Sequence, residues 1–263
     1  MIDDRPVSLL GLALEVASEA ATLIRSSVAR TDLTITSKSN ATDLVTEIDH
    51  AVEALVAGRL LEARPDDGLL GEEGTTRTGR SRVRWVVDPI DGTTNFVYRV
   101  PYFAVSIAAE IDGTVVAGVV AIPSLAETFE ALLGGGARCN GEAGSASSES
   151  EPATALVATG FSYDAGRRAA QGRVVGRLLP QIRDIRRMGA ASVDLCSVAC
   201  GRVDGYFESG LRPWDWAAGA LIAAEAGAVV TDFTGGAPSP AGVLAVNPGL
   251  YRSLRDLLDT CSA

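Results

Sequence analysis

Histidine and closely paired cysteines are almost absent from this chain of 263 residues, which has one histidine and four cysteines. The cysteines are Cys139, Cys196, Cys200 and Cys261, and no C-x-x-C pair occurs among them. Structural zinc sites and disulfide frameworks need such residues at characteristic spacings. We therefore expect reduced thiols, with neither a zinc site nor a disulfide framework. The single histidine, His50, falls within an expected helix and is interpreted as an exposed helix residue.

Two well-known hydrolase motifs are missing as well. There is no G-x-x-x-x-G-K-[ST] loop, so nucleotide hydrolysis of the P-loop kind is not indicated. There is no G-x-S-x-G elbow, and the lone histidine makes a Ser-His-Asp triad an unsuitable interpretation.

Positive charge is in short supply, because the formal net charge is −10. An acidic protein repels nucleic-acid phosphates and anionic membrane surfaces, so neither is an expected partner. If the substrate is itself an anion, the protein needs a local source of positive charge. Bound metal cations are the simplest such source.

No uninterrupted apolar run of 18 residues occurs, and the N-terminal stretch does not have the pattern of a signal peptide. That stretch carries Asp3 and Asp4 before its apolar part, which is then interrupted by Glu15 and Glu19. We expect a soluble cytoplasmic protein.

The hydrophobic pattern predicts a mixed α/β sandwich in two sub-layers. Asp112-Gly113 is a hairpin signal inside the apolar stretch 103–122, so part of the sheet should be antiparallel. Thr46 and Asp49 form a capping pair at the start of a helix that should end before Pro65. Further helices are expected at about 7–28, 165–180, 191–201, 214–227 and 248–259, further strands at 68–74, 82–88, 128–133, 155–160, 203–209, 228–233 and 242–247, and a linker at 141–152.

Carboxylates lie at one end of three predicted apolar elements, an unusual place for charged residues. Glu72 and Glu73 follow an apolar strand, Asp88 and Asp91 end the strand "WVVDPID", and Asp215 begins an alanine-rich helix. Each acid taken alone has an ordinary explanation as a turn residue or a helix-start anion. Together they form a set of hard oxygen ligands without histidine or thiolate, which suits Mg²⁺ or Mn²⁺.

The residues after Asp91 indicate what such metals would serve. Gly92 allows a ligand to approach the backbone, and the N–H groups around Thr93 and Thr94 can form a small nest for an anion. Magnesium with open coordination positions commonly serves phosphate chemistry.

These motifs together resemble the inositol monophosphatase family of magnesium-dependent, lithium-sensitive phosphatases. The resemblance rests on "GEEG", "WVVDPIDGTTNF" and "WDWAAG" in this order, with "KSNATDLVTEID" (38–49), "RRMGAASVDL" (186–195) and "GYFESGLRPWD" in support. It implies one domain over residues 1–263, with sub-layers of about 1–145 and 146–263. The implied fold is a layered α/β/α/β/α sandwich with a partly antiparallel sheet, and the family also implies a homodimer.

The resemblance implies a role for each site residue. Glu72, Asp88 and the carbonyl of Ile90 match the ligands of a first metal, and Asp88, Asp91 and Asp215 those of a second. A weaker third metal would lie near Glu72, with Asp49 reaching it through water. Glu72 and Thr93 match the pair that orients the attacking water. The residues matching the phosphate and polyol contacts are Gly92, Thr93, Ala191 and Glu208.

The chain departs from the family at Gly189-Ala190-Ala191-Ser192, where the family usually has a hydroxyl directly after the glycine.

The implied reaction is hydrolysis of a phosphate monoester by metal-activated water, with inositol 1-phosphate as the leading substrate and two or three Mg²⁺ ions. Histidinol phosphate, fructose 1,6-bisphosphate, 3'-phosphoadenosine 5'-phosphate and NADP remain alternative substrates. A regulatory, partner-binding protein on the same fold is a further alternative.

Overall fold

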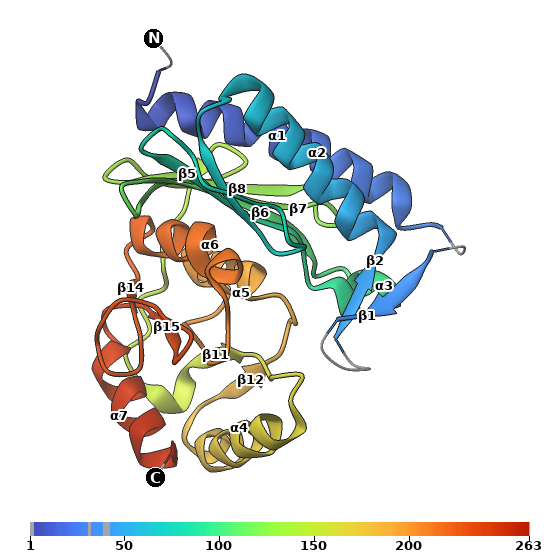
Figure 1. Cartoon of the computed structure of the whole chain (residues 1–263). Coiled ribbons are helices and arrows are strands. Elements are labelled where there is room, and N and C mark those ends of the chain that lie inside the picture. Colours follow the sequence, from blue (N-terminus) through green and yellow to red (C-terminus); the bar gives the residue numbers. More distant parts are fainter. Residues whose placement is uncertain (1–2, 31–32, 39–42, 263) are drawn as a thin grey trace.

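The structure, a computed structural model, describes residues 3–30, 33–38 and 43–262. Helices and sheets alternate through the molecule from the N-terminal to the C-terminal side (Figure 1). A helical pair covers one face of a large sheet, a second pair separates that sheet from a smaller one, and a third pair closes the far side. The predicted layered α/β/α/β/α sandwich is therefore confirmed.

The larger sheet has eight strands in the order β10-β9-β8-β7-β6-β5-β3-β4. β3 runs parallel to β5, and all other neighbours are antiparallel, including the β6–β7 hairpin predicted at Asp112-Gly113. A separate ribbon joins β1 and β2. The strands are β1 (Ile35–Ser37), β2 (Leu44–Thr46), β3 (Gly68–Gly71), β4 (Thr76–Arg77), β5 (Val83–Asp91), β6 (Ala104–Ile111), β7 (Thr114–Ile122), β8 (Glu127–Leu132), β9 (Gly136–Cys139) and β10 (Glu142–Ala143).

Helices α1 (Pro6–Ser27) and α2 (Glu47–Ala63) cover the outer face of this sheet. The predicted capping box is present at α2, because the Thr46 side chain accepts helix amides and Asp49 accepts the Thr46 amide. By length and composition α1 could cross a membrane. Its apolar stripe, with Leu9, Val16 and Ile24 fully or almost fully buried, packs against the sheet, as in a core helix of the same composition.

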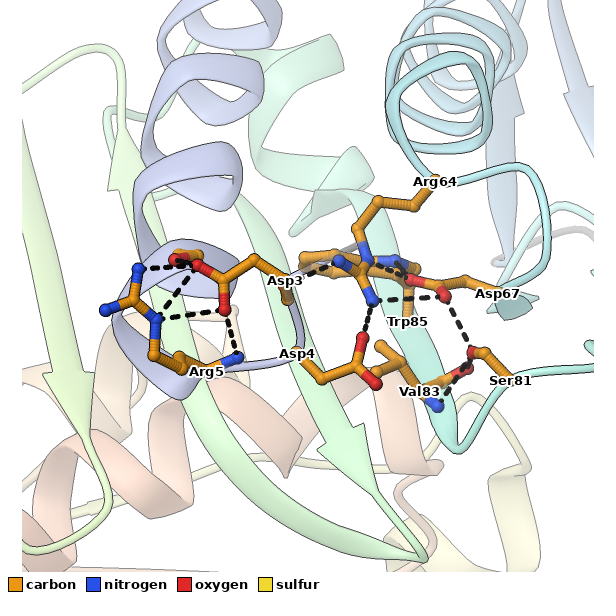
Figure 2. Close-up of polar contacts among 9 residues, drawn as sticks. Asp3, Asp4, Arg5, Arg64, Asp67, Ser81, Val83 and Trp85 are labelled. Carbon is orange, nitrogen blue, oxygen red and sulfur yellow. Dashed lines mark hydrogen bonds and ion pairs between the residues drawn. The ribbon is translucent and has the colours of Figure 1, made fainter. Parts of the chain in front are cut away.

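A buried polar cluster ties the beginning of the chain to the far end of α2 (Figure 2). The Arg64 guanidinium donates to the Asp3 carbonyl at 2.8 Å and pairs with Asp67. Asp67 also accepts the Trp85 indole N–H at 2.9 Å and the Ser81 hydroxyl at 2.7 Å. Because nearly every polar atom of the cluster finds a partner, a buried ion pair is tolerated there.

Helices α5 (Ala191–Ala199) and α6 (Pro213–Glu225) form the central layer between the two sheets. The second sheet has the order β12-β11-β13-β15-β14 and mixes parallel with antiparallel pairs. Helices α4 (Ala165–Leu178) and α7 (Tyr251–Ser262) cover its outer face. Its strands are β11 (Leu156–Thr159), β12 (Asp184–Arg186), β13 (Gly205–Glu208), β14 (Val229–Thr231) and β15 (Val243–Val246), and the 3₁₀ turns are η1 (Pro152–Thr154) and η2 (Leu179–Gln181).

One short helix was not expected from the sequence. α3 (Thr93–Tyr98) begins directly after Gly92, whose left-handed φ of 89° turns the chain out of β5. The sequence had predicted there only a small nest of amides for an anion. The expected linker at 141–152 includes β10 and then crosses from the larger to the smaller sheet.

Candidate active site and metal centre

A cleft of about 700 Å³ opens where the two sheets and the central helices meet. The end of β5 supplies Asp88 and Asp91, the start of α6 supplies Asp215, and the turn after β3 supplies Glu72. Acids far apart in the sequence therefore meet in one place, as their positions at element ends had predicted.

An irregularity at the end of β5 explains how both of its aspartates can serve this cleft. Residues three apart on a regular strand face opposite sides of the sheet. The pairing of β5 with β6 shifts register between Asp88 and Asp91, around Pro89, which has no N–H to donate to the ladder. The shift turns the second carboxylate towards the same cleft as the first.

Asp88, Asp91 and Asp215 each place one carboxylate oxygen within 4.8 Å of the others. Burial, then repulsion by Glu72, raises the pKa of Asp88 well above its ordinary value. Burial also raises the pKa of Asp91, to about 6, and that of Asp215. Asp88 Oδ1 is buried and has no hydrogen-bond partner among the described residues. Three crowded hard-oxygen donors with an unsatisfied oxygen fit a divalent cation, which would remove the repulsion.

Lys38 lines the cleft with the three aspartates and pairs with Glu72 and Glu73. Its Nζ lies 2.8 Å from Glu72 Oε1 and 2.5 Å from Glu73 Oε1. Burial lowers the pKa of Lys38, but Glu72 and Glu73 outweigh it and raise the pKa overall. Lys38 begins the motif 38–49, of which residues 39–42 lie outside the described part of the chain. The sequence had singled out this motif but not its lysine.

Glu53 supports the turn that carries Glu72. It is 3% exposed, and its carboxylate accepts the amides of Glu73 at 2.7 Å and Thr75 at 2.9 Å. A Cβ at Gly71 would lie 2.5 Å from Glu53 Oε2, so a larger residue there would displace this carboxylate. Glu53 was missed from the sequence, although it lies one helical turn after Asp49 on the same helix.

Thr93 is held between two acceptors. Its Oγ1 lies 2.8 Å from Asp49 Oδ1 and 3.0 Å from the carbonyl oxygen of Ile90. Asp49 is fully buried and also accepts the amide and hydroxyl of Thr46. Asp49 does not line the cleft, so its contact with the site runs through Thr93.

The backbone at Gly92 lies close to two other segments of the chain. A Cβ on this residue would lie 2.9 Å from the Tyr102 carbonyl oxygen and 3.1 Å from the Ala190 Cβ, and the φ of 89° already favours glycine. Gly92 and the first amides of α3 line the cleft beside the aspartates.

The opposite side of the cleft is formed by the second half of the chain. Glu208 ends β13 and its Oε2 accepts the Tyr206 hydroxyl at 2.8 Å. Burial raises the pKa of Glu208 to about 7. Ala191, at the start of α5, lies on the same wall, and Arg167, Arg187 and Arg212 also line the cleft. The sequence had not predicted these arginines as site residues.

The structure thus gathers almost all of the predicted site residues around one cleft. Those lining it are Glu72, Asp88, Ile90, Asp91, Gly92, Thr93, Ala191, Glu208 and Asp215, whereas Asp49 stands behind Thr93. His50 is exposed, with 59% of its side chain accessible, as expected from the sequence.

Comparison with known proteins agrees with this geometry. The model of the inositol monophosphatase family matches residues 6–259. A Mycobacterium tuberculosis protein named inositol-1-monophosphatase SuhB is 42% identical, over 96% of this chain and 93% of its own length. An Escherichia coli protein named Nus factor SuhB is 42% identical, over 87% of this chain and 86% of its own. The crystal structure of the suppressor protein SuhB from Bartonella henselae superposes with a TM-score of 0.91 at 34% identity, covering 95% of this chain and 98% of that one.

The fold and the acidic centre therefore define a phosphatase of a metal-dependent kind. Within that class, the chain belongs to the inositol monophosphatase family.

Proposed function

We propose that the protein is a Mg²⁺-dependent phosphate monoester hydrolase that converts inositol 1-phosphate to myo-inositol and phosphate. The observation that carries the proposal is the group of three aspartates, Asp88, Asp91 and Asp215, whose oxygens lie within 4.8 Å of one another beside a large cleft. A polyol phosphate has the anionic group that such a centre attracts once cations are bound.

The ligand assignment is the one that the family resemblance implies, and its residues all line the cleft. Glu72, Asp88 and the carbonyl of Ile90 would hold a first cation, and Asp88, Asp91 and Asp215 a second. A third, weaker cation near Glu72 completes the proposal, and Mn²⁺ can replace Mg²⁺ in an all-oxygen site. When bound, the cations would lower the pKa of water and stabilise the entering and leaving oxygens of an in-line displacement.

The protein's own groups would orient the attacking water. Thr93 Oγ1 lies 2.8 Å from Asp49 Oδ1, so the buried carboxylate accepts the hydrogen bond of the threonine hydroxyl. The threonine oxygen then keeps a lone pair that can accept a hydrogen bond from a water in the cleft. Glu72, at the cleft wall, would be the second acceptor for that water. Asp49 acts in this scheme by fixing the direction of the Thr93 hydroxyl.

The phosphate would bind at the beginning of α3. The left-handed turn at Gly92 brings the backbone close, and the first amides of the helix, at Gly92 and Thr93, can donate to phosphate oxygens. Remaining positive charge would come from Lys38, which lines the same cleft.

The polyol ring would lie against Glu208 and Ala191. A carboxylate accepts hydrogen bonds only, and a polyol offers several donors, so the chemistry is complementary. The Tyr206 hydroxyl fixes Glu208 Oε2, which leaves the second oxygen of the carboxylate for the ligand.

The same chemistry on histidinol phosphate, fructose 1,6-bisphosphate, 3'-phosphoadenosine 5'-phosphate or NADP is the alternative. We further propose a single domain of two sub-layers, lithium sensitivity, a cytoplasmic location and a homodimer, all on the basis of the family. A regulatory role through a protein partner is the second candidate function. It is favoured by the E. coli relative, whose name describes a Nus factor.

The test is a phosphate-release assay on the purified chain, with each candidate substrate, in Mg²⁺ and in EDTA. The expected result is Mg²⁺-dependent turnover with inositol 1-phosphate as the best substrate. Turnover that persists fully in EDTA would contradict the metal-dependent mechanism. A higher kcat/KM for another phosphate ester would replace inositol 1-phosphate as the substrate, and no turnover on any ester would favour the regulatory role.

A further inference from the structure

Helix α5 begins directly against one of the metal-site aspartates. The hydroxyl and the backbone amide of Ser192 both donate to Asp91 Oδ2, each at 2.6 Å. Ser192 is fully buried and Asp91 is 8% exposed, so water does not compete strongly for these bonds. The two residues are far apart in the sequence, and they connect the end of β5 with the central helical layer.

This contact constrains the carboxylate in two ways. Two donors from one residue converge on a single oxygen, which restricts rotation of the Asp91 carboxylate about its Cβ–Cγ bond. Hydrogen bonds to an ionised acceptor are roughly twice as strong as neutral ones, and the first turn of a helix adds a favourable partial positive charge. Both effects favour a charged, fixed Asp91 where burial and neighbouring acids oppose the charge.

A second buried serine on the same helix shows what a hydroxyl does there without such a role. Ser197 is 3% exposed, and its hydroxyl donates to the Val193 carbonyl oxygen at 2.8 Å, within the helix itself. The Ser192 hydroxyl instead leaves its own helix and reaches a carboxylate on another element. The partner of the Ser192 hydroxyl is therefore not the backbone carbonyl to which a serine inside a helix commonly donates.

We infer that Ser192 is a positioning residue, which holds Asp91 in the orientation that binds a divalent cation and so sets the affinity of that cation. The inference rests on the proposed function, because it takes Asp91 as a ligand. It also explains the displaced hydroxyl in Gly189-Ala190-Ala191-Ser192: at position 192 the hydroxyl serves the metal centre rather than the substrate.

The experiment is calorimetric titration of Mg²⁺ and of Mn²⁺ into the metal-free, full-length protein. Ser192→Ala removes only the hydroxyl, keeps the amide and leaves a good helix former. Loss of a residue that orients a metal ligand typically weakens metal binding by about 10- to 100-fold. We expect a loss in this range for Ser192→Ala, and an intermediate loss for Ser192→Cys, whose thiol is a weaker donor.

Ser197→Ala is the matched control, because it deletes a buried hydroxyl from the same helix without touching a carboxylate. Its metal affinity should stay within about twofold of the wild type, since the Ser197 hydroxyl bonds within the helix and does not contact Asp91. Urea unfolding in EDTA separates the two roles. A merely structural role of Ser192 would lower stability in EDTA and leave metal affinity unchanged, and that result would overturn the inference.

Three other outcomes are informative. An equal loss of metal affinity in Ser192→Ala and Ser197→Ala would also overturn the inference, because it would reflect general loosening of α5. If the wild type itself binds no divalent cation, the inference and the proposed metal-dependent function fail together. If the wild type binds cations and Ser192→Ala binds them equally well, only the role of Ser192 is wrong.

Discussion

Glu53 and Glu73 are joined by a hydrogen bond in which the Glu53 carboxylate oxygen Oε2 accepts the Glu73 amide proton over 2.7 Å. The other oxygen accepts the Thr75 amide at 2.9 Å, so one buried side chain of α2 satisfies two amides of the turn after β3. Glu72 stands at the start of this turn. The geometry of a proposed metal ligand therefore depends on a residue that does not line the cleft.

Replacing this carboxylate should destabilise the protein. Glu53→Gln keeps the size but places an amide donor opposite a backbone N–H, which leaves one buried donor unsatisfied at a cost of about 1–3 kcal/mol. The free energy of unfolding should fall by this amount in urea titration. Glu62→Gln, on the exposed side of the same helix, is the control and should change stability by less than about 0.5 kcal/mol. Equal stability of Glu53→Gln and the wild type would contradict the role given to the turn.

Replacing Asp215 with asparagine should affect stability and activity differently. Without metal, Asp215 lies among carboxylates that oppose its charge. Asp215→Asn should therefore unfold no more easily than the wild type in EDTA. With Mg²⁺ it should lose most of its kcat, because a proposed ligand is gone. Normal kcat in this variant would return Asp215 to an ordinary helix-start acid, which accepts the Arg212 amide at 2.6 Å.

The same charges predict how stability depends on pH in the absence of metal. The pKa of Asp91 is raised to about 6 in the folded state, so folding favours its protonated form. Its stabilising contribution is complete below the ordinary value of 3.8 and is lost as the pH rises through about 6. In EDTA, unfolding of the wild type should therefore become easier between about pH 4 and pH 7 relative to Asp91→Asn, by an amount on the order of a few kcal/mol.

Metal should cancel this difference. At pH 7, saturating Mg²⁺ stabilises the wild type by RT ln(1 + [L]/Kd), about 2.7 kcal/mol at a hundredfold excess over Kd. Asp91→Asn should gain much less. The predicted pH dependence is wrong if the wild type and Asp91→Asn follow parallel stability curves in EDTA between about pH 4 and pH 7.

Glu208 should determine the choice of substrate. Above its pKa of about 7, Glu208 is ionised, and a hydrogen bond to a charged group contributes about 1.5–3 kcal/mol, or roughly 10- to 150-fold in affinity. Glu208→Gln should raise KM for inositol 1-phosphate within that range and spare kcat, if the bond is equally strong in the ground and transition states. p-Nitrophenyl phosphate, which offers no ring hydroxyls, should be affected little. Equal effects on both esters would show that the ring contact is assigned wrongly.

Gly92 should be intolerant of any side chain. Gly92→Ala combines a left-handed backbone with contacts of 2.9 Å and 3.1 Å, so it should cost more than the roughly 1–2 kcal/mol of strain alone. Gly113→Ala is the control for strain, because its φ of 82° is similar and nothing lies within 4 Å of the new methyl group. Measured by urea unfolding, similar costs for the two variants would argue against the tight approach at Gly92.

Local signals predicted much of this molecule. The Thr46–Asp49 capping box and the Asp112-Gly113 hairpin are written in neighbouring residues, and both are present. The order of the layers was taken from the family resemblance, because spacing along the chain does not say which face of a sheet a helix covers. α3 was missed because a six-residue helix entered through a left-handed glycine has no apolar periodicity to detect.

The limits within the site are of the same kind. The carboxylates could be predicted because each interrupts an apolar element. The role of Glu53 could not be predicted, because its partner, the Glu73 amide, lies 20 residues away and is brought to it only by the tertiary fold. Asp49 was identified, but its partner Thr93 lies on another element, and no spacing rule indicates that contact.

The central helical layer has a consequence for how the chain is made. Asp88 and Asp91 are synthesised well before Asp215, yet all three oxygens belong to one cluster. The face of the larger sheet that carries Val86 and Val120 is covered by α5 and α6, which come from the second half of the sequence. A nascent chain that ends near residue 145 therefore exposes an apolar sheet and holds an incomplete acidic centre. The larger sheet lacks the cover on this face until α6 has left the ribosome, and the smaller sheet lacks β14 and β15 until still later. The three aspartates proposed to hold one cation therefore come together only after most of the chain has been made.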